Sequence, residues 1–320
     1  MRLLSLAVII SLIVTLLGCS LIKGRGTYYL ESEQYEAGIK DFGKVLSQNP
    51  NDPEANYYLG RFYLAEEKPE QALPFLRRAA ELEPRRADYC FWLGVGHWAV
   101  RDFEAERTSY LRALAADPDY IPARLYLGHN FLDGGRPEMA LRQYEKVLGL
   151  DPYNPEALYN TGLALNESRR VTEAVDAWNG YVKYYPDGKW ALRAVDHLNE
   201  LGDFSYRNFA IGYRRVPLEA IAFAPGSTKA ISRGEFSLEV IGSILKIYEE
   251  IKLEIVAYVR GNAPQATARA GAVRDWLLTS FPTIHSSRLK ARGEGNAETI
   301  ETGNRVYLLD ESVSFVTTKK

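Results

Sequence analysis

Apolar and small residues recur along the first two-thirds of the chain with one fixed period. Two series mark that period, and neighbouring members of each are 34 positions apart: Gly26, Gly60, Gly94, Gly128 and Gly162, and Pro50, Pro84, Pro118, Pro152 and Pro186. Five copies at one spacing are typical of a solenoid, in which each unit packs on its neighbours.

Each unit has the pattern of two packed helices. The apolar positions of the second unit return in the fourth: Leu59, Gly60, Tyr63, Ala72, Leu76, Ala79 and Pro84 correspond to Leu127, Gly128, Phe131, Ala140, Tyr144, Val147 and Pro152. We expect small residues where the helices cross closely, large residues beside them, and proline at the end of the second helix. After Pro186, Trp190 to Leu201 has helical spacing and predicts a helix that caps the stack.

These positions resemble the signature of the tetratricopeptide repeat (TPR) family, in which leucine-glycine, tyrosine, alanine, an aromatic residue and proline follow at the same offsets. The resemblance covers residues 19–202 and implies an all-α TPR solenoid of five repeats plus the capping helix. The first unit departs most, with Arg25, Gly38 and Val45 in the leucine and alanine positions.

The N-terminus has the pattern of a cleaved signal. Arg2 precedes an apolar run from Leu3 to Leu17, which is short for a transmembrane helix. Leu16-Leu17-Gly18-Cys19 resembles the lipobox of bacterial lipoproteins. The resemblance implies a signal peptide at 1–18, acyl chains on Cys19 and a lipid membrane as a partner; Ser20, which is not aspartate, favours the outer membrane. The alternative is an ordinary secretory signal with a chance cysteine.

The pattern changes after residue 215. We expect residues 203–215 to be a linker that packs against its neighbours because it is rich in aromatic residues. The predicted elements from 216 to 320 follow the order β-α-β-α-β-β, an α+β sandwich with its helices on one face of a mixed sheet. They are Val216–Phe223, Phe236–Tyr248, Leu253–Val259, Ala266–Ser280, Leu289–Ala291 and Val306–Val316.

This order and several short motifs resemble the OmpA-like periplasmic domain. The motifs are Ile221-Ala222-Phe223, Gly226-Ser227, Arg269-Ala270, Ser287-Arg288-Leu289, Gly293-Glu294-Gly295 and Gly303-Asn304-Arg305-Val306. In that family, an aspartate and an arginine grip the diaminopimelate of peptidoglycan. Arg269 lies at the arginine position, but Arg260 replaces the aspartate, and an arginine accepts no hydrogen bond. We therefore expect a degenerate site; the alternatives are peptidoglycan binding in altered geometry and a structural or protein-contact module.

The resemblance to TPR proteins also implies a ligand surface along the first helices of the repeats. The positions there mix aromatic and polar residues: Tyr57, Arg61, Phe91, Trp98, His129, Asp133, Tyr159 and Asn166. Such a surface suits an extended peptide or a partner helix. The alternative for each residue, above all Tyr57 and Phe91, is packing between neighbouring repeats. The lysine and asparagine pattern of the carboxylate clamp is missing, so a C-terminal carboxylate is not the expected ligand.

Composition and motifs favour binding over catalysis. A net charge of −2 and a pI near 6.2 give no electrostatic reason to bind nucleic acid. The histidines lie in separate units or domains without metal-ligand spacing, no catalytic motif appears, and we expect no cofactor or metal. Cys90 lies in a helix position of the repeat, which predicts a buried, unreactive thiol and no intramolecular disulfide.

The sequence thus predicts an outer-membrane lipoprotein that faces the periplasm and acts as a non-enzymatic adaptor, recruiting an envelope protein through its TPR groove. The first alternative is an anchor whose main function is to bind peptidoglycan. The second is a cell-wall enzyme with an unrecognised site.

Overall fold

The computed structural model describes residues 22–229 and 234–318 of the chain. The predicted signal peptide and Cys19 lie outside the described residues. The chain divides into two compact units, Met1–Pro152 and Tyr153–Lys320. We describe each unit by itself.

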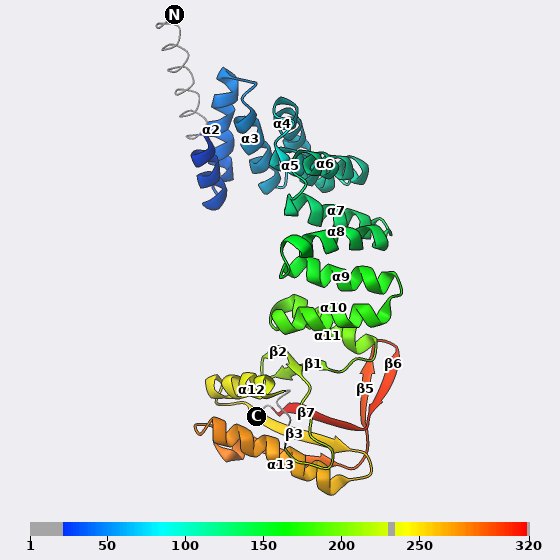
Figure 1. Ribbon diagram of the computed structural model, residues 1–320. Coiled ribbons are helices and arrows are strands. Elements are labelled where there is room, and N and C mark those ends of the chain that lie inside the picture. Colours follow the sequence, from blue (N-terminus) through cyan, green and yellow to red (C-terminus); the bar gives the residue numbers. More distant parts are fainter. Residues whose placement is uncertain (1–21, 230–233, 319–320) are drawn as a thin grey trace, which may run out of the picture. The chain divides into compact units, whose positions relative to one another are not determined.

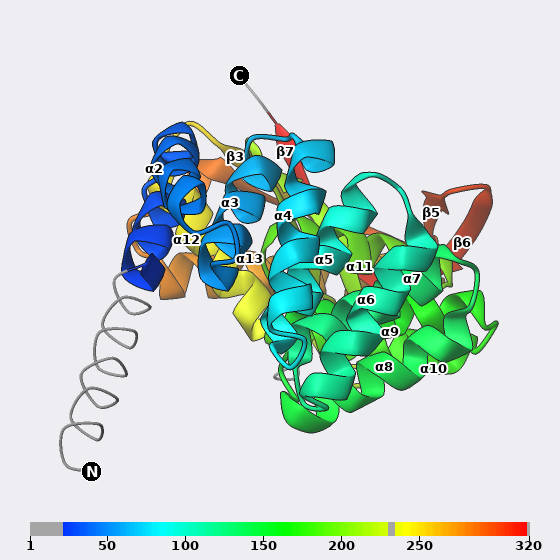
Figure 2. The same ribbon diagram turned by 90° about the horizontal axis from the view of Figure 1, so that it is seen from above.

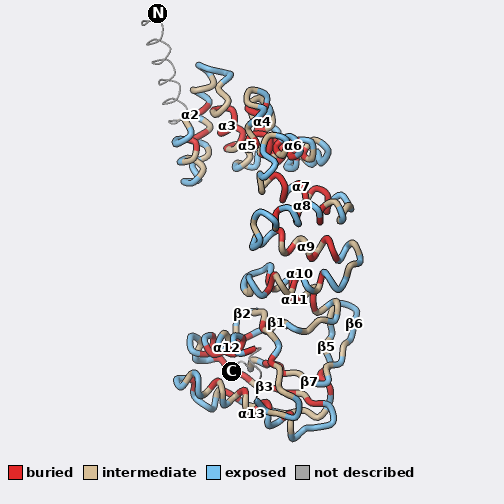
Figure 3. The backbone as a smooth tube through the Cα atoms, in the orientation of Figure 1, coloured by how far each residue is buried: buried red, intermediate tan, exposed pale blue. Residues whose placement is uncertain are grey.

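The first unit consists of helices that pack in consecutive antiparallel pairs (Figure 1). After a helical stretch at 22–31, its helices are α2 (Tyr35–Gln48), α3 (Pro53–Ala65), α4 (Pro69–Leu82), α5 (Ala87–Ala99), α6 (Phe103–Ala116), α7 (Ile121–Asp133) and α8 (Pro137–Leu150). Buried stretches alternate with exposed ones along these helices (Figure 3). The repeat period thus predicted the two-helix units of this part of the chain.

The repeat glycines lie where two helices of one pair touch. A Cβ atom built on Gly94 in α5 would lie 2.3 Å from the Tyr110 ring of α6, and one on Gly128 in α7 would lie 2.5 Å from the Tyr144 ring of α8. Both rings are fully buried. The absence of a side chain at each glycine therefore makes room for an aromatic ring, as the small-and-large pattern predicts.

The turn within each pair uses one left-handed residue, and these residues also keep the 34-residue spacing. The φ angles are 54° at Glu33, 56° at Glu67, 62° at Arg101 and 65° at Gly135. Helices commonly end in this conformation, usually with glycine. Three of these four turns hold it without glycine, which the sequence pattern alone does not indicate.

The second unit begins with three helices, α9 (Pro155–Glu167), α10 (Val171–Tyr184) and α11 (Gly188–Glu200). Helix α11 is the predicted capping helix, and it buries Ala191, Ala194, Val195 and Leu198. It contacts α10 on one side and strands β1 and β2 on the other. The cap is therefore itself covered by the C-terminal region.

The C-terminal region combines strands with two helices. Its elements are β1 (Tyr206–Ile211), β2 (Arg214–Glu219), α12 (Glu235–Ile247), β3 (Lys252–Val259), α13 (Ala263–Ser280), η1 (Ser286–Arg288), β4 (Leu289–Glu294), β5 (Glu298–Thr302), β6 (Arg305–Leu309) and β7 (Glu311–Thr318). Strand β3 is central: it pairs in parallel with β4, Leu253 opposite Leu289, and antiparallel with β7, Ile255 opposite Phe315. Helix α13 packs on β3 and β4, and α12 contacts α13.

Two pairs of strands lie outside this three-stranded sheet. Strands β1 and β2 form an antiparallel hairpin, and β5 and β6 form a second antiparallel ribbon in which Ile300 lies opposite Tyr307. Figures 1 and 2 both show the β5–β6 ribbon apart from strands β3 and β7.

The structure confirms that residues 203–215 pack against their neighbours, α11 and β7, but it corrects their secondary structure. Instead of a linker, this segment contains β1 and the start of β2, with Gly212 at a φ of 65° in the turn. Strand β1 packs on β7, where the Phe209 and Phe315 rings are 5.4 Å apart. The predicted order β-α-β-α-β-β therefore lacks β1 and β5, and its last strand is two strands, β6 and β7. The apolar pattern did not predict this strand because it contains the polar residues Arg207 and Asn208. Both side chains make hydrogen bonds to other elements.

Candidate functional site

The first helices of the repeats hold the predicted ligand residues, and two of these in the first unit are buried. Tyr57 on α3 is 7% exposed and stacks on Tyr89, with ring centroids 4.7 Å apart. Phe91 on α5 is 6% exposed and contacts the ring of Tyr126 on α7, with centroids 5.2 Å apart. These two residues fit the packing alternative, and together they form the floor of the surface.

Arg61 lies on this floor between two aromatic side chains. Its guanidinium carbon is 4.1 Å from the centre of the Trp92 ring and 5.4 Å from that of Tyr57. It also donates a hydrogen bond of 3.1 Å from Nη1 to the Tyr57 hydroxyl. Cation–π contacts and this hydrogen bond hold the guanidinium in one orientation.

Exposed aromatic side chains lie on the same helices. Trp98 on α5 is 53% exposed and Tyr126 on α7 is 36% exposed. Trp98 lines a cavity of about 490 Å³ together with Leu64, Pro69 and Phe103. Large exposed rings on rigid helices are typical of surfaces that bind other proteins.

The polar residues predicted on α7 differ in exposure. His129 is largely buried, its ring 5.4 Å from that of Tyr126, and burial lowers its pKa to about 4. It is therefore neutral at pH 7 and does not add charge to the surface. Asp133, at the end of α7, is exposed, although partial burial raises its pKa.

The two predicted ligand residues of the second unit, Tyr159 and Asn166, also differ in exposure. Tyr159 on α9 is 4% exposed, lies 4.8 Å from the Trp190 ring, and has its hydroxyl 3.3 Å from Nε2 of His197. Asn166 is exposed at the end of the same helix. Tyr159 therefore packs between α9 and the capping helix, whereas Asn166 is accessible.

Two further aromatic residues, Trp92 and Tyr126, lie on the first helices α5 and α7 and were not among the predicted ligand residues. They are 34 residues apart and so occupy one position of the repeat, next to the position of Phe91. Comparing that position between the repeats would have revealed two large aromatic residues on neighbouring first helices.

Arg260 and Arg269, the two arginines of the predicted peptidoglycan site, both have acidic partners within the chain. Arg269 is 2% exposed, donates to Glu311 at 2.8 Å and to the carbonyl of Ser227 at 3.1 Å, and lies 4.8 Å from the Phe223 ring. Its Nη2 atom is buried without a hydrogen-bond partner in the described part of the chain. Arg260 is exposed and pairs with Asp310 at 3.1 Å. Glu311 therefore takes a place at Arg269 that an external carboxylate could otherwise occupy.

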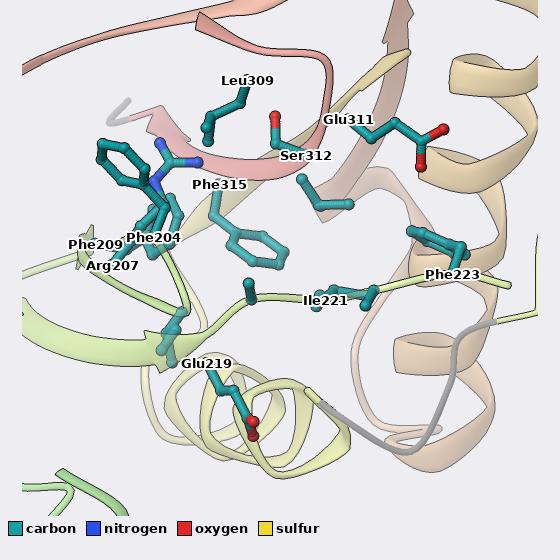
Figure 4. Close-up of a pocket in the computed structure, with 14 residues that line it drawn as sticks. Phe204, Arg207, Phe209, Glu219, Ile221, Phe223, Leu309, Glu311, Ser312 and Phe315 are labelled. Carbon is teal, nitrogen blue, oxygen red and sulfur yellow. The ribbon is translucent and has the colours of Figure 1, made fainter. Parts of the chain in front are cut away.

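A cavity of about 260 Å³ lies between the β1–β2 hairpin and β7. Figure 4 shows the ring of Phe315 near its centre and Phe209 at one side, close to Phe204 and Arg207, while the carboxylates of Glu219 and Glu311 point outward. Arg207 also lines it, but both of its terminal nitrogens donate to Glu298, at 2.8 and 2.9 Å. The polar groups at this cavity are thus largely engaged in structural contacts.

No group of His, Cys, Asp and Glu side chains among the described residues has the arrangement of a metal site. Cys90 is buried as predicted, and burial raises the pKa of its thiol. Within residues 22–229 and 234–318, the structure contains no helix that is long and apolar enough to cross a membrane.

Comparison with known proteins supports the repeat assignment. One tetratricopeptide repeat family model matches residues 29–89, and a second matches residues 63–121 and 125–189. Residues 29–121 and 125–189 are tetratricopeptide repeats. The solved structure of Pseudomonas aeruginosa pilF has a similar fold, with a TM-score of 0.52 and 20% identity over 57% of this chain and 82% of that one.

Curated relatives are similar over parts of their length. Tetratricopeptide repeat protein 8 of Caenorhabditis elegans is 26% identical over 44% of this chain and 28% of its own. Cellulose synthase operon protein C of Pseudomonas fluorescens is 26% identical over 42% of this chain and 11% of its own. The chain spans between a fifth and a third of the length of the first curated relatives it matches.

Proposed function

We propose that this TPR protein is a non-enzymatic adaptor of the bacterial envelope, which recruits an envelope protein through the first-helix surface of its repeats. Proteins built of such repeats generally act as interaction scaffolds. The observation that carries the proposal is the set of first helices α3, α5 and α7, where Trp98 and Tyr126 are exposed and Arg61 contacts the Trp92 ring. Rigid aromatic residues and arginine commonly dominate the energy of protein interfaces.

The adaptor is proposed to be an outer-membrane lipoprotein that faces the periplasm. Support comes from the sequence, where the apolar run from Leu3 to Leu17 ends at Gly18-Cys19. Two or more acyl chains on Cys19 would give stable anchoring. A Cys19→Ser variant should lose lipid and leave the membrane fraction, which mass spectrometry and cell fractionation would measure. A variant that keeps its membrane association would contradict the anchor.

The C-terminal region is proposed to be an OmpA-like domain whose peptidoglycan site is degenerate. The charge reversal at Arg260 and the occupation of Arg269 by Glu311 support this proposal. The unpartnered Nη2 atom of Arg269 favours the alternative, an anchor that binds the cell wall. Sedimentation with purified peptidoglycan separates the two: the degenerate site predicts no pelleting, and pelleting that disappears in Arg269→Ala would support the anchor.

Site-specific crosslinking in cells tests the adaptor directly. A photoreactive amino acid at position 98 or 126 should crosslink a partner protein on illumination. The matched control is Leu111 on α6, a second helix, which is 50% exposed and equally apolar. Crosslinks from position 111 alone, or from none of the three, would contradict binding through the first-helix surface.

A further inference from the structure

Arg61 carries a positive charge that its surroundings orient but do not neutralise. In the described part of the chain no carboxylate forms an ion pair with it, and its contacts are the Tyr57 hydroxyl and the two rings. Burial raises the pKa of Tyr57, so that this phenol stays neutral beside the guanidinium. The Nε atom of Arg61 is buried without a hydrogen-bond partner in the described part of the chain.

The neighbouring acid is already occupied. Asp88 on α5 accepts two hydrogen bonds from Arg86, 2.9 Å from Nε and 2.7 Å from Nη2. Burial raises the pKa of Tyr120, at the start of α7; the charge of Asp88 raises this pKa further, and the charge of Arg61 lowers it. The surface between α3, α5 and α7 therefore has an arginine whose charge remains available and an aspartate whose charge is paired.

An arginine held flat against rings suits one kind of ligand group. Its planar set of donors matches the two oxygens of a carboxylate, and little rotamer entropy is lost because the side chain is already ordered. The exposed ring of Tyr126 and the buried ring of Phe91 beneath it supply apolar contact on the adjacent helix. A partner that fits must therefore place an acid between apolar residues.

We propose that the first-helix surface binds an acidic peptide segment, with an internal aspartate or glutamate on Arg61 and flanking apolar side chains on the aromatic residues of α5 and α7. This inference rests on the proposed adaptor function and specifies the chemistry of the partner. It differs from recognition of a chain terminus, because the carboxylate comes from a side chain.

The test uses the full chain in detergent and two fluorescent peptides of twelve residues, acetylated and amidated so that their termini are uncharged. One alternates leucine, phenylalanine and glutamate, and the other has glutamine in place of glutamate. Fluorescence anisotropy should show at least tenfold tighter binding of the glutamate peptide, since a hydrogen bond between two charged groups is stronger than one to a neutral amide. The preference should weaken as salt is raised.

Arg61→Met should abolish the preference, because methionine keeps the packing on Trp92 and removes the charge. Arg61→Lys should retain part of it. The matched control is Arg78→Met on the second helix α4, where the arginine is exposed and paired with Glu81; this variant should bind like the unmodified chain. Circular dichroism confirms that each variant is folded.

Equal binding of both peptides, no binding of either, or an unchanged preference in Arg61→Met would overturn the inference. The adaptor function has a separate readout in Tyr126→Ala. If both peptides bind equally and both weaken in that variant, the surface binds peptides but does not select acids. The proposed function would then stand while the acidic partner would not.

Discussion

At the residue scale, the repeat glycines are determined by the rings that face them. Gly128 lies against Tyr144, whereas a methyl group added to Gly149 on the neighbouring helix α8 would meet no atom within 4 Å. Gly128→Ala should therefore lower the free energy of unfolding by about 2 kcal/mol, because the added carbon forces the ring to move. Gly149→Ala should leave it equal or raise it by up to about 1 kcal/mol. Chemical denaturation of both variants measures the contrast, and equal effects would contradict the close contact.

His129 predicts a loss of stability in mild acid. Burial lowers its pKa to about 4 from an ordinary value of 6.5, so the unfolded chain binds a proton between these values that the folded chain does not. Stability from this group is full above pH 6.5 and falls as the pH decreases toward 4. Between pH 7 and 5 the loss should be about 2 kcal/mol. His129→Gln should reduce this pH dependence in unfolding experiments; an unchanged difference between the two pH values would exclude His129 as its source.

The ligand surface shows which residue properties a sequence reveals. The repeat spacing predicted that Arg61 lies on a first helix, and α3 contains it. Spacing could not tell that Tyr57 is buried under Tyr89, because the exposure of one position depends on the ring that the next repeat contributes. The role of Trp92 depends on its contact with Arg61, 31 residues earlier, and no local pattern carries such a contact.

At the element scale, local periodicity succeeded where an element packs through one face and failed where polar residues are buried. The helices of the repeats and α13 follow apolar spacing and were predicted. Strand β1 was not, since its Arg207 is engaged by Glu298, a partner 91 residues later. Glu298 is 7% exposed and also accepts hydrogen bonds from Ser312, at 2.6 Å, and from Ser314.

This buried cluster predicts strong coupling between β1 and β5. Burial alone would raise the pKa of Glu298, but hydrogen bonds from Arg207 and the two serines hold it below its usual value. Removing one partner leaves a buried charge, so Glu298→Leu or Arg207→Leu should each cost about 3 kcal/mol of unfolding free energy. The double variant should cost clearly less than the sum. Additive costs in the double-mutant cycle would contradict the coupling. The control is Glu173→Gln on the exposed surface of α10, which should change the free energy of unfolding little.

At the scale of the whole molecule, the boundary predicted at residue 202 separates elements that the structure joins. Helix α11 belongs to the repeats by sequence, yet Asn208 of β1 donates to the carbonyl of Leu192 and to Asp196, both at 2.8 Å. From β6, the Tyr307 hydroxyl donates to the carbonyl of Glu200 at 2.9 Å. The repeat period shows where the last repeat ends in the sequence. It does not show which elements pack together, because the hydrogen bonds of Asn208 and Tyr307 to α11 follow no period.

Two fragments test this joining. Residues 153–320 contain α9 to α11 with the C-terminal region and should melt in one cooperative transition, because the capping helix and the β1–β2 hairpin share hydrogen bonds. Residues 203–320 lose the acceptors on α11 and expose the side of the hairpin that faced it, so the melting temperature of this fragment should be lower by several degrees. Calorimetry of both fragments gives the comparison. If the shorter fragment melts at the temperature of the longer one, α11 contributes nothing to the stability of the C-terminal region and belongs to the repeats alone.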